Sequence, residues 1–144
     1  MKRLLLIIFM CLMWPGFLSA NAAGARLVIV TSAQSPIHQM TPDEARKLYL
    51  GMPMVVDGKL IHPLRNNSDA TMQEMFMQKV MFMSTQAYER QILSRVFRTG
   101  GNRPPVYTEM PELLKALESD HNAVTYLPRD TAISTVGVRI ILEP

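Results

Sequence analysis

The run RLVIVT at residues 26–31 sets the strongest limit on the fold, because it is an unbroken series of mostly β-branched apolar residues. Such a run is typical of a strand that is covered on both faces, as in a parallel sheet with helices packed over it. A strand with one wet face would alternate apolar and polar residues instead. The run therefore predicts an α/β domain in which helices cover both sides of a sheet.

The segment after this strand carries a clear helix start. Thr41-Pro42-Asp43-Glu44 has an N-cap threonine, a proline at the first helical position and a glutamate at the third, which together make a capping box. We expect a helix to Leu50, ended by Gly51. Asp57-Gly58 then predicts a tight hairpin turn between two short extended pieces.

The remaining chain continues to alternate helical and extended patterns. Apolar residues at helical spacing predict helices near residues 70–82, 86–97 and 110–118. Apolar runs at residues 123–127 and 137–142 predict two further strands, the last of which is expected to pair with an existing edge. The stretch TGGNRPP at residues 99–105 is rich in glycine and proline and predicts a loop.

The first 22 residues have the pattern of a signal peptide. Lys2 and Arg3 precede the apolar run Leu4–Trp14, and Ala20-Asn21-Ala22 forms a cleavage site with small residues at both ends. The apolar run falls short of the roughly 20 residues that span a bilayer. We therefore expect an exported, periplasmic protein that is not embedded in the membrane after processing, with one domain over residues 23–144.

Composition excludes several classes of protein. Cys11, the only cysteine, lies in the predicted signal peptide, so the processed chain relies on its hydrophobic core rather than on disulfides. Loss of Lys2 and Arg3 leaves 13 basic and 12 acidic residues. This balance, without a basic stripe, argues against nucleic acid as a partner.

The stretch from Ile61 to Phe76 is the best candidate for a ligand site. It reads as a short strand, a polar turn and then a helix, and a helix start offers unpaired backbone N–H groups and a positive dipole to small anions. The candidate ligand-binding residues of this turn carry hydrogen-bond donors and are Arg65, Asn67, Ser68 and Thr71. The alternative interpretation is that Ser68 or Asp69 simply caps the helix.

Thr31 and Ser32 complete the candidate site. They follow the first strand at its C-terminal end, where open α/β sheets usually place their ligands. We therefore expect them to face the same crevice as the polar turn.

The order of these segments resembles a known family. The pieces TPDEARKLYLG, DGKLIHPLRN, SDATMQEMF, FRTGGNRPP and AVTYLP are similar to small, single-domain members of the phosphate-type periplasmic substrate-binding proteins, the solute receptors of ABC transporters. The resemblance implies a single type II periplasmic-binding-protein-like domain with a mixed, mostly parallel sheet flanked by helices. It further implies a small anion as ligand and a membrane transporter or sensor protein as partner.

The resemblance also implies site residues and a departure from the family pattern. The arginine and threonine that surround the anion in full-length phosphate receptors correspond to Arg65 and Thr71, whereas the serine and glycine correspond to Asp69 and Ala70. A carboxylate about 4 Å from an anion costs roughly 1 to 4 kcal/mol. The leading hypothesis is therefore an exported solute-binding domain that binds a small oxyanion such as phosphate weakly or in degenerate form.

Other chemistry has little support in the sequence. The chain lacks GxSxG and HExxH motifs, and its processed form lacks a cysteine nucleophile, so we expect a protein that is not an enzyme and uses no cofactor. His38, His62 and His121 match no metal-ligand spacing and are expected to be isolated surface or loop residues.

The methionines between Met72 and Met83 leave two further hypotheses open. Thioethers are soft ligands, so a Met-rich Cu(I)-binding protein is one reading, although packing of a flexible side chain explains most of these residues. On an α-helical wheel Met77 and Met81 lie opposite the large apolar face. They are expected to pack under a loop or to form an exposed patch, which would suit an accessory or sensory interaction module without a ligand.

Overall fold

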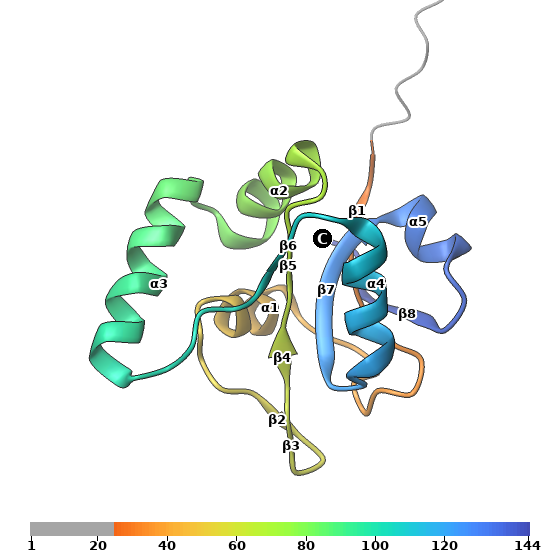
Figure 1. Cartoon of the computed structure of the whole chain (residues 1–144), viewed down its shortest axis with the longest axis horizontal. Coiled ribbons are helices and arrows are strands. Elements are labelled where there is room, and N and C mark those ends of the chain that lie inside the picture. Colours follow the sequence, from red (N-terminus) through yellow and green to blue (C-terminus); the bar gives the residue numbers. More distant parts are fainter. Residues whose placement is uncertain (1–24) are drawn as a thin grey trace, which may run out of the picture.

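The computed structural model describes residues 25–144, so the predicted signal peptide at residues 1–22 lies outside the described residues. A four-stranded sheet with the order β4-β7-β1-β8 forms the centre of the molecule (Figure 1). Its strands are β1 (Leu27–Ser32), β4 (His62–Pro63), β7 (Ala123–Pro128) and β8 (Val138–Leu142).

The sheet is mixed, as predicted. β4, β7 and β8 run in one direction, because β4 pairs parallel with β7 while both β7 and β8 pair antiparallel with β1. The expectation of parallel neighbours for the first strand is wrong, since β1 runs against the strands on both of its sides. Burial on both faces favours parallel sheets but does not require them, because helices cover this mixed sheet equally well.

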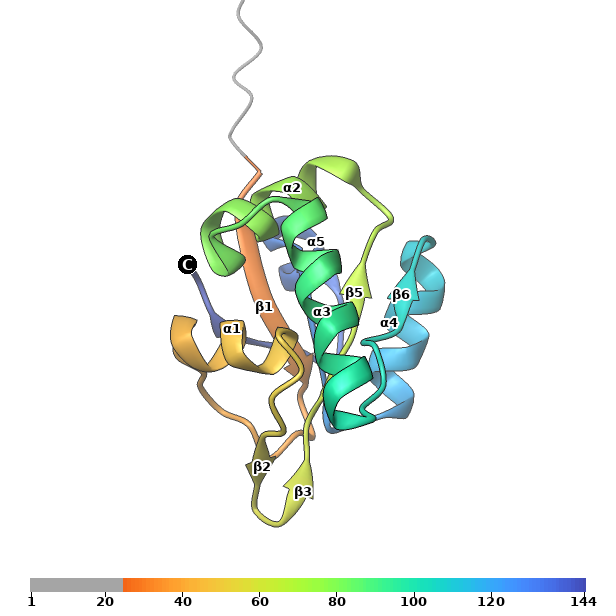
Figure 2. The same ribbon diagram turned by 90° about the vertical axis from the view of Figure 1, so that its left-hand side faces the viewer.

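Side chains of β1 point alternately into two hydrophobic cores, as the period of a strand demands. Leu27 and Ile29 belong to the larger core, under α1 (Pro42–Tyr49), α2 (Ala70–Phe76) and α3 (Thr85–Thr99). Val28 and Val30 belong to the smaller core, under α4 (Met110–Ser119) and α5 (Arg129–Ser134). Figures 1 and 2 show the two sets of helices on opposite sides of the sheet.

Two local predictions are confirmed. The Thr41 hydroxyl accepts a hydrogen bond from the Glu44 N–H at 3.2 Å, and Glu44 Oε2 accepts one from the Thr41 N–H at 2.8 Å, which closes the capping box of α1. The hairpin joins β2 (Val55–Val56) to β3 (Lys59–Leu60). Asp57 and Gly58 adopt φ values of 50° and 74°, the left-handed pair that a tight hairpin turn needs.

The predicted helix over residues 70–82 is not α-helical throughout. α2 ends at Phe76 and continues as a π-helical turn over Met77–Met81, after which Phe82 adopts a left-handed φ of 54°. A π turn takes up one more residue than an α turn, so later side chains fall behind their positions on the α-helical wheel. Met77 and Met81 lie in the larger core, 2% and 0% exposed, so the expected exposed patch is wrong.

Several short elements had no prediction. β5 (Arg65–Asn66) pairs parallel with β6 (Val106–Tyr107), which follows the Pro-rich loop, and α5 separates β7 from β8. The Arg65 N–H donates to the Pro105 carbonyl and the Asn67 N–H to the Tyr107 carbonyl. This pairing brings the loop after α3 against the predicted ligand stretch. No helix within residues 25–144 is long and apolar enough to cross a membrane.

Candidate functional site

Arg65 is the centre of the candidate site, and its side chain is buried. Arg65 lies on β5, and its guanidinium lies beneath α3, where the side chain is 3% exposed. Its Nη2 donates to Glu89 Oε1 at 2.6 Å. The guanidinium carbon also lies 4.9 Å from the centre of the Tyr88 ring, a cation–π contact.

Glu89 joins a second arginine to the first. Its other oxygen, Oε2, accepts a hydrogen bond from Arg103 Nη2, so one carboxylate bridges two guanidinium groups. The three charged groups together carry a net charge of +1. The side chains of Glu89 and Arg103 are 34% and 50% exposed, so solvent reaches this side of the cluster. The sequence placed Arg103 only in a predicted loop and did not point to Glu89. The only local sign of a role for Glu89 was that this carboxylate follows the buried Tyr88 in the sequence.

Tyrosines form the inner wall of the cluster. Burial raises the pKa of Tyr88 to about 12, so its phenol stays protonated at neutral pH. That hydroxyl donates to the Tyr49 carbonyl at 2.8 Å and fixes the ring beneath Arg65. Burial likewise raises the pKa of Tyr126, whose ring stacks on Phe76 with the ring centres 3.9 Å apart.

Three buried polar atoms near the end of β5 have no hydrogen-bond partner among residues 25–144. They are Arg65 Nε, Asn67 Oδ1 and Tyr126 Oη. Arg65 therefore uses only part of its donor fork on Glu89, although a guanidinium normally offers adjacent Nε and Nη groups to the same anion. Buried donors without partners are uncommon in folded proteins.

The polar turn before α2 is closed by its own side chains. Asn66 Oδ1 accepts from the Ser68 N–H at 3.0 Å and from the Ser68 hydroxyl at 2.6 Å. Asn66 also donates to the Tyr126 carbonyl at 2.9 Å, so the turn is tied to β7. The hydroxyl of Ser68, a predicted ligand donor, is thus already hydrogen-bonded to Asn66. Ligand binding by Asn67 and Ser68 stays a prediction.

Asp69 confirms the capping interpretation of the α2 start. Its Oδ1 accepts from the Thr71 N–H at 2.8 Å and from the Met72 N–H at 3.3 Å. The carboxylate occupies the amides that were expected to meet an anion. Thr71 is exposed beside this cap. The start of α2 therefore carries the negative carboxylate of Asp69. The positive group nearest to it in the sequence is Arg65, on β5.

Thr31 and Ser32 do not share this crevice. Thr31 lies opposite Val124 at the start of β7, whereas Asn66 contacts Tyr126 farther along that strand. The Thr31 hydroxyl donates to the Ala123 carbonyl at 2.7 Å, and Ser32 Oγ lies 3.1 Å from His121 Nδ1. The expected convergence is wrong because β1 runs antiparallel to β7, so its C-terminal end meets the beginning of β7.

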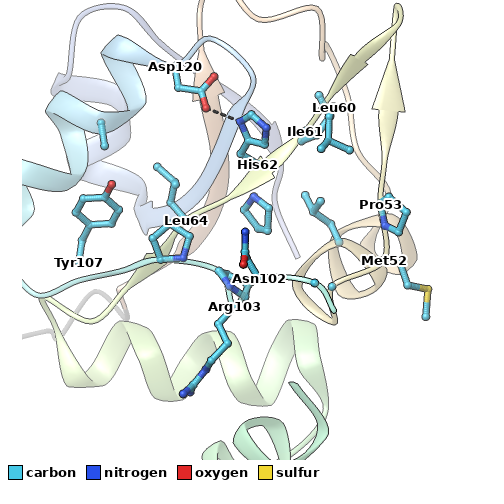
Figure 3. A pocket seen from close by; sticks show the side chains of 17 residues that line it. Met52, Pro53, Leu60, Ile61, His62, Leu64, Asn102, Arg103, Tyr107 and Asp120 are labelled. Carbon is cyan, nitrogen blue, oxygen red and sulfur yellow. Dashed lines mark hydrogen bonds and ion pairs between the residues drawn. The ribbon is translucent and has the colours of Figure 1, made fainter. Parts of the chain in front are cut away.

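A groove of about 600 Å³ opens beside Arg103, between α4 and the segment that carries β3 and β4 (Figure 3). Its lining is mostly apolar and includes Met52, Leu60, Ile61, Leu64, Pro104 and Tyr107. His62 Nδ1 and Asp120 Oδ2 lie 2.6 Å apart at its edge, within hydrogen-bond distance, so His62 is not the isolated residue that was expected. The guanidinium of Arg103 points away from the groove.

Metal ligands do not gather in the described part of the chain. Across residues 25–144 no group of three His, Asp, Glu or Cys side chains could hold a metal ion. Met72, Met77 and Met81 are buried among apolar side chains of the larger core. Core packing therefore accounts for the methionines, and the Cu(I) hypothesis gains no support from their placement.

Comparison with known proteins shows the fold alone. No protein-family model and no curated protein sequence matches the chain. A crystal structure of an ABC-type phosphate transport receptor from Vibrio cholerae is similar, with a TM-score of 0.58 and 12% sequence identity. The match covers 81% of this chain and 45% of that receptor, so the chain spans less than half of its length. The chain thus has a mixed α/β fold of the periplasmic-binding-protein type, a distant structural match to a transport receptor.

Proposed function

We propose that this chain is an exported, non-enzymatic solute-binding domain that binds a small oxyanion such as phosphate weakly, with Arg65 as the charged contact. The observation that carries the proposal is the buried guanidinium of Arg65, whose Nε has no partner among the described residues. A buried cation with a free donor, on a fold that resembles a phosphate transport receptor, fits an anion better than a neutral ligand.

Weak binding follows from the surroundings of Arg65. Glu89 already neutralises one positive charge, and Asp69 holds the amides at the α2 start. The chain also spans less than half of the similar receptor, so a lone copy leaves a small anion in contact with water. The proposed setting is the periplasm, with a membrane transporter or sensor protein as the partner.

Calorimetric titration with phosphate and sulfate at constant ionic strength tests the proposal. We expect dissociation constants in the millimolar range for the processed chain and no heat for Arg65→Met, which keeps the apolar part of the side chain. Arg98→Met, on the exposed end of α3, is the matched control for loss of one positive charge. A folded wild-type protein without heat at millimolar anion would overturn the proposal.

A second candidate function is an interaction module, favoured by the outer surface of α3. Leu93 and Phe97 lie one turn apart and are 46% and 82% exposed. This α3 apolar pair replaces Met77 and Met81 as the expected interface. A second copy of the chain is the occupant proposed here, because a copy would supply the part of the receptor fold that one chain does not span.

Sedimentation velocity tests the interaction module. We expect a dimer at tens of micromolar protein that dissociates in Phe97→Asp and persists in Val136→Asp. Val136 is 99% exposed in the loop before β8, so its variant places the same new charge on a different surface. A wild-type protein that stays monomeric over the whole concentration range removes this candidate.

A further inference from the structure

Glu89 binds Arg65 and Arg103 in the way that a ligand oxyanion would. One of its oxygens meets Arg65 and the other meets Arg103, on two separate segments of the chain. Guanidinium groups bind carboxylates and phosphates through the same fork of N–H donors. A pair of arginines that holds this carboxylate is therefore also chemically suited to a phosphate or sulfate group.

The Glu89 carboxylate does not use the full capacity of the arginine pair. Arg65 Nε is buried and has no partner within residues 25–144, although it belongs to the same donor fork as the Nη2 that Glu89 contacts. A tetrahedral oxyanion has oxygens left over for such a donor after each arginine has been engaged. The free Nε thus indicates that a ligand with more oxygens than a carboxylate suits this place better.

The position of Arg65 does not depend on Glu89 alone. The Tyr88 ring supports the guanidinium from one side, and the bond from the Tyr88 hydroxyl to the Tyr49 carbonyl holds that ring in place. β5 itself is fixed by its pairing with β6. The Glu89 side chain is about one third exposed, so solvent reaches it. Its carboxylate can therefore be exchanged for a soluble anion without dismantling the core.

We propose that Arg65 and Arg103 form a two-arginine oxyanion site, and that Glu89 is an internal competitor which occupies it in the absence of ligand. This inference rests on the proposed function and names the group that limits its affinity. Binding of phosphate requires Glu89 to turn away, and the competition sets the weak affinity of the wild-type chain. Asp69 and the α2 start stay outside this site, because they satisfy one another.

Phosphate titration of Glu89→Gln tests the competition, because glutamine keeps the shape of the side chain and removes its charge. We expect an affinity for phosphate about ten-fold or more above that of the wild type, since a neighbouring like charge is lost. Glu118→Gln on α4 changes the net charge equally at an exposed position and should match the wild type. Glu89→Gln/Arg65→Met should bind no phosphate.

Arg103→Ala keeps the test informative even if Glu89→Gln does not fold. Arg103 is half exposed, so its loss leaves the core intact, and phosphate binding to the otherwise wild-type chain should weaken several-fold. Measurable wild-type binding that neither Glu89→Gln nor Arg103→Ala alters would overturn this inference while the proposed function stands. If neither the folded wild type nor a folded Glu89→Gln variant binds phosphate, both the proposed function and the two-arginine site are wrong.

Discussion

Asp69 and Glu89 are two carboxylates at the edge of the same region, and they differ in what they bind. Asp69 is exposed and accepts from neutral amides two and three residues away along the chain. Glu89 is partly buried and contacts arginines 24 and 14 residues away. The first contact stabilises one helix start, whereas the second joins α3 to β5 and to the loop before β6. The difference shows that the carboxylate which holds the buried Arg65 lies far from it in sequence.

The largest expected effect is that of Glu89→Ala on stability. Removal of the carboxylate leaves Arg65 buried with an uncompensated charge, so the free energy of unfolding should fall by about 3 kcal/mol. Urea denaturation measures the loss. The double variant Arg65→Met/Glu89→Ala should recover most of it, because an apolar pair needs no compensation. A single variant within 0.5 kcal/mol of the wild type would contradict the difference between the two carboxylates.

Asp69→Ala should have a smaller and purely local effect. Loss of the cap of α2 lowers the free energy of unfolding by about 1 kcal/mol, and Asp69→Asn, which keeps an accepting oxygen, should lose less. Phosphate titration of Asp69→Asn sharpens the comparison further. A gain in affinity equal to that of Glu89→Gln would move the oxyanion site to the α2 start.

Glu44 provides a reference for a carboxylate that acts only as part of a cap. Hydrogen bonds from Thr41, the backbone one above all, lower the pKa of Glu44 from its ordinary value of 4.5. Because the folded pKa is the lower one, this contribution is complete above pH 4.5 and is lost as the pH falls through the folded pKa. The free energies of unfolding of the wild type and Glu44→Gln, measured by urea denaturation, should differ by less than about 1 kcal/mol at pH 6. This difference should shrink in acid. Parallel curves would contradict the lowered pKa of Glu44.

The smallest expected effect is that of Tyr126→Phe. The Tyr126 hydroxyl is buried without a partner in the described part of the chain, so its removal should leave stability unchanged or raise it by a few tenths of a kcal/mol. Tyr49→Phe is the control, because the Tyr49 hydroxyl donates to the Leu64 and Val124 carbonyls and its loss should cost about 1 kcal/mol. A loss of more than about 1 kcal/mol in Tyr126→Phe would show that the hydroxyl is engaged in solution.

Part of the candidate site could be predicted from the sequence. Arg65 was identified from the resemblance and from its place before a helix, and Asp69 was identified as the residue that decides whether the α2 start is free. Glu89 and Arg103 could not be assigned to the site from the sequence, because their contact depends on the β5–β6 pairing. Strands of two residues are too short to show a recognisable sequence pattern. Thr31 and Ser32 do lie at the C-terminal end of β1, but they were wrongly expected to face the crevice of the polar turn, because strand direction has no local signal.

The sequence by itself determined the features that depend on neighbouring residues. The buried β1, the capping box at Thr41 and the hairpin at Asp57-Gly58 follow from side-chain period, hydrogen bonding over three residues and backbone sterics. Tertiary structure alone decided the direction of β1, the π turn at Met77–Met81 with the burial of both methionines, and the bridge from Glu89 to two arginines. These features depend on which distant segments meet, and that is settled by the packing of the whole core rather than by local preference.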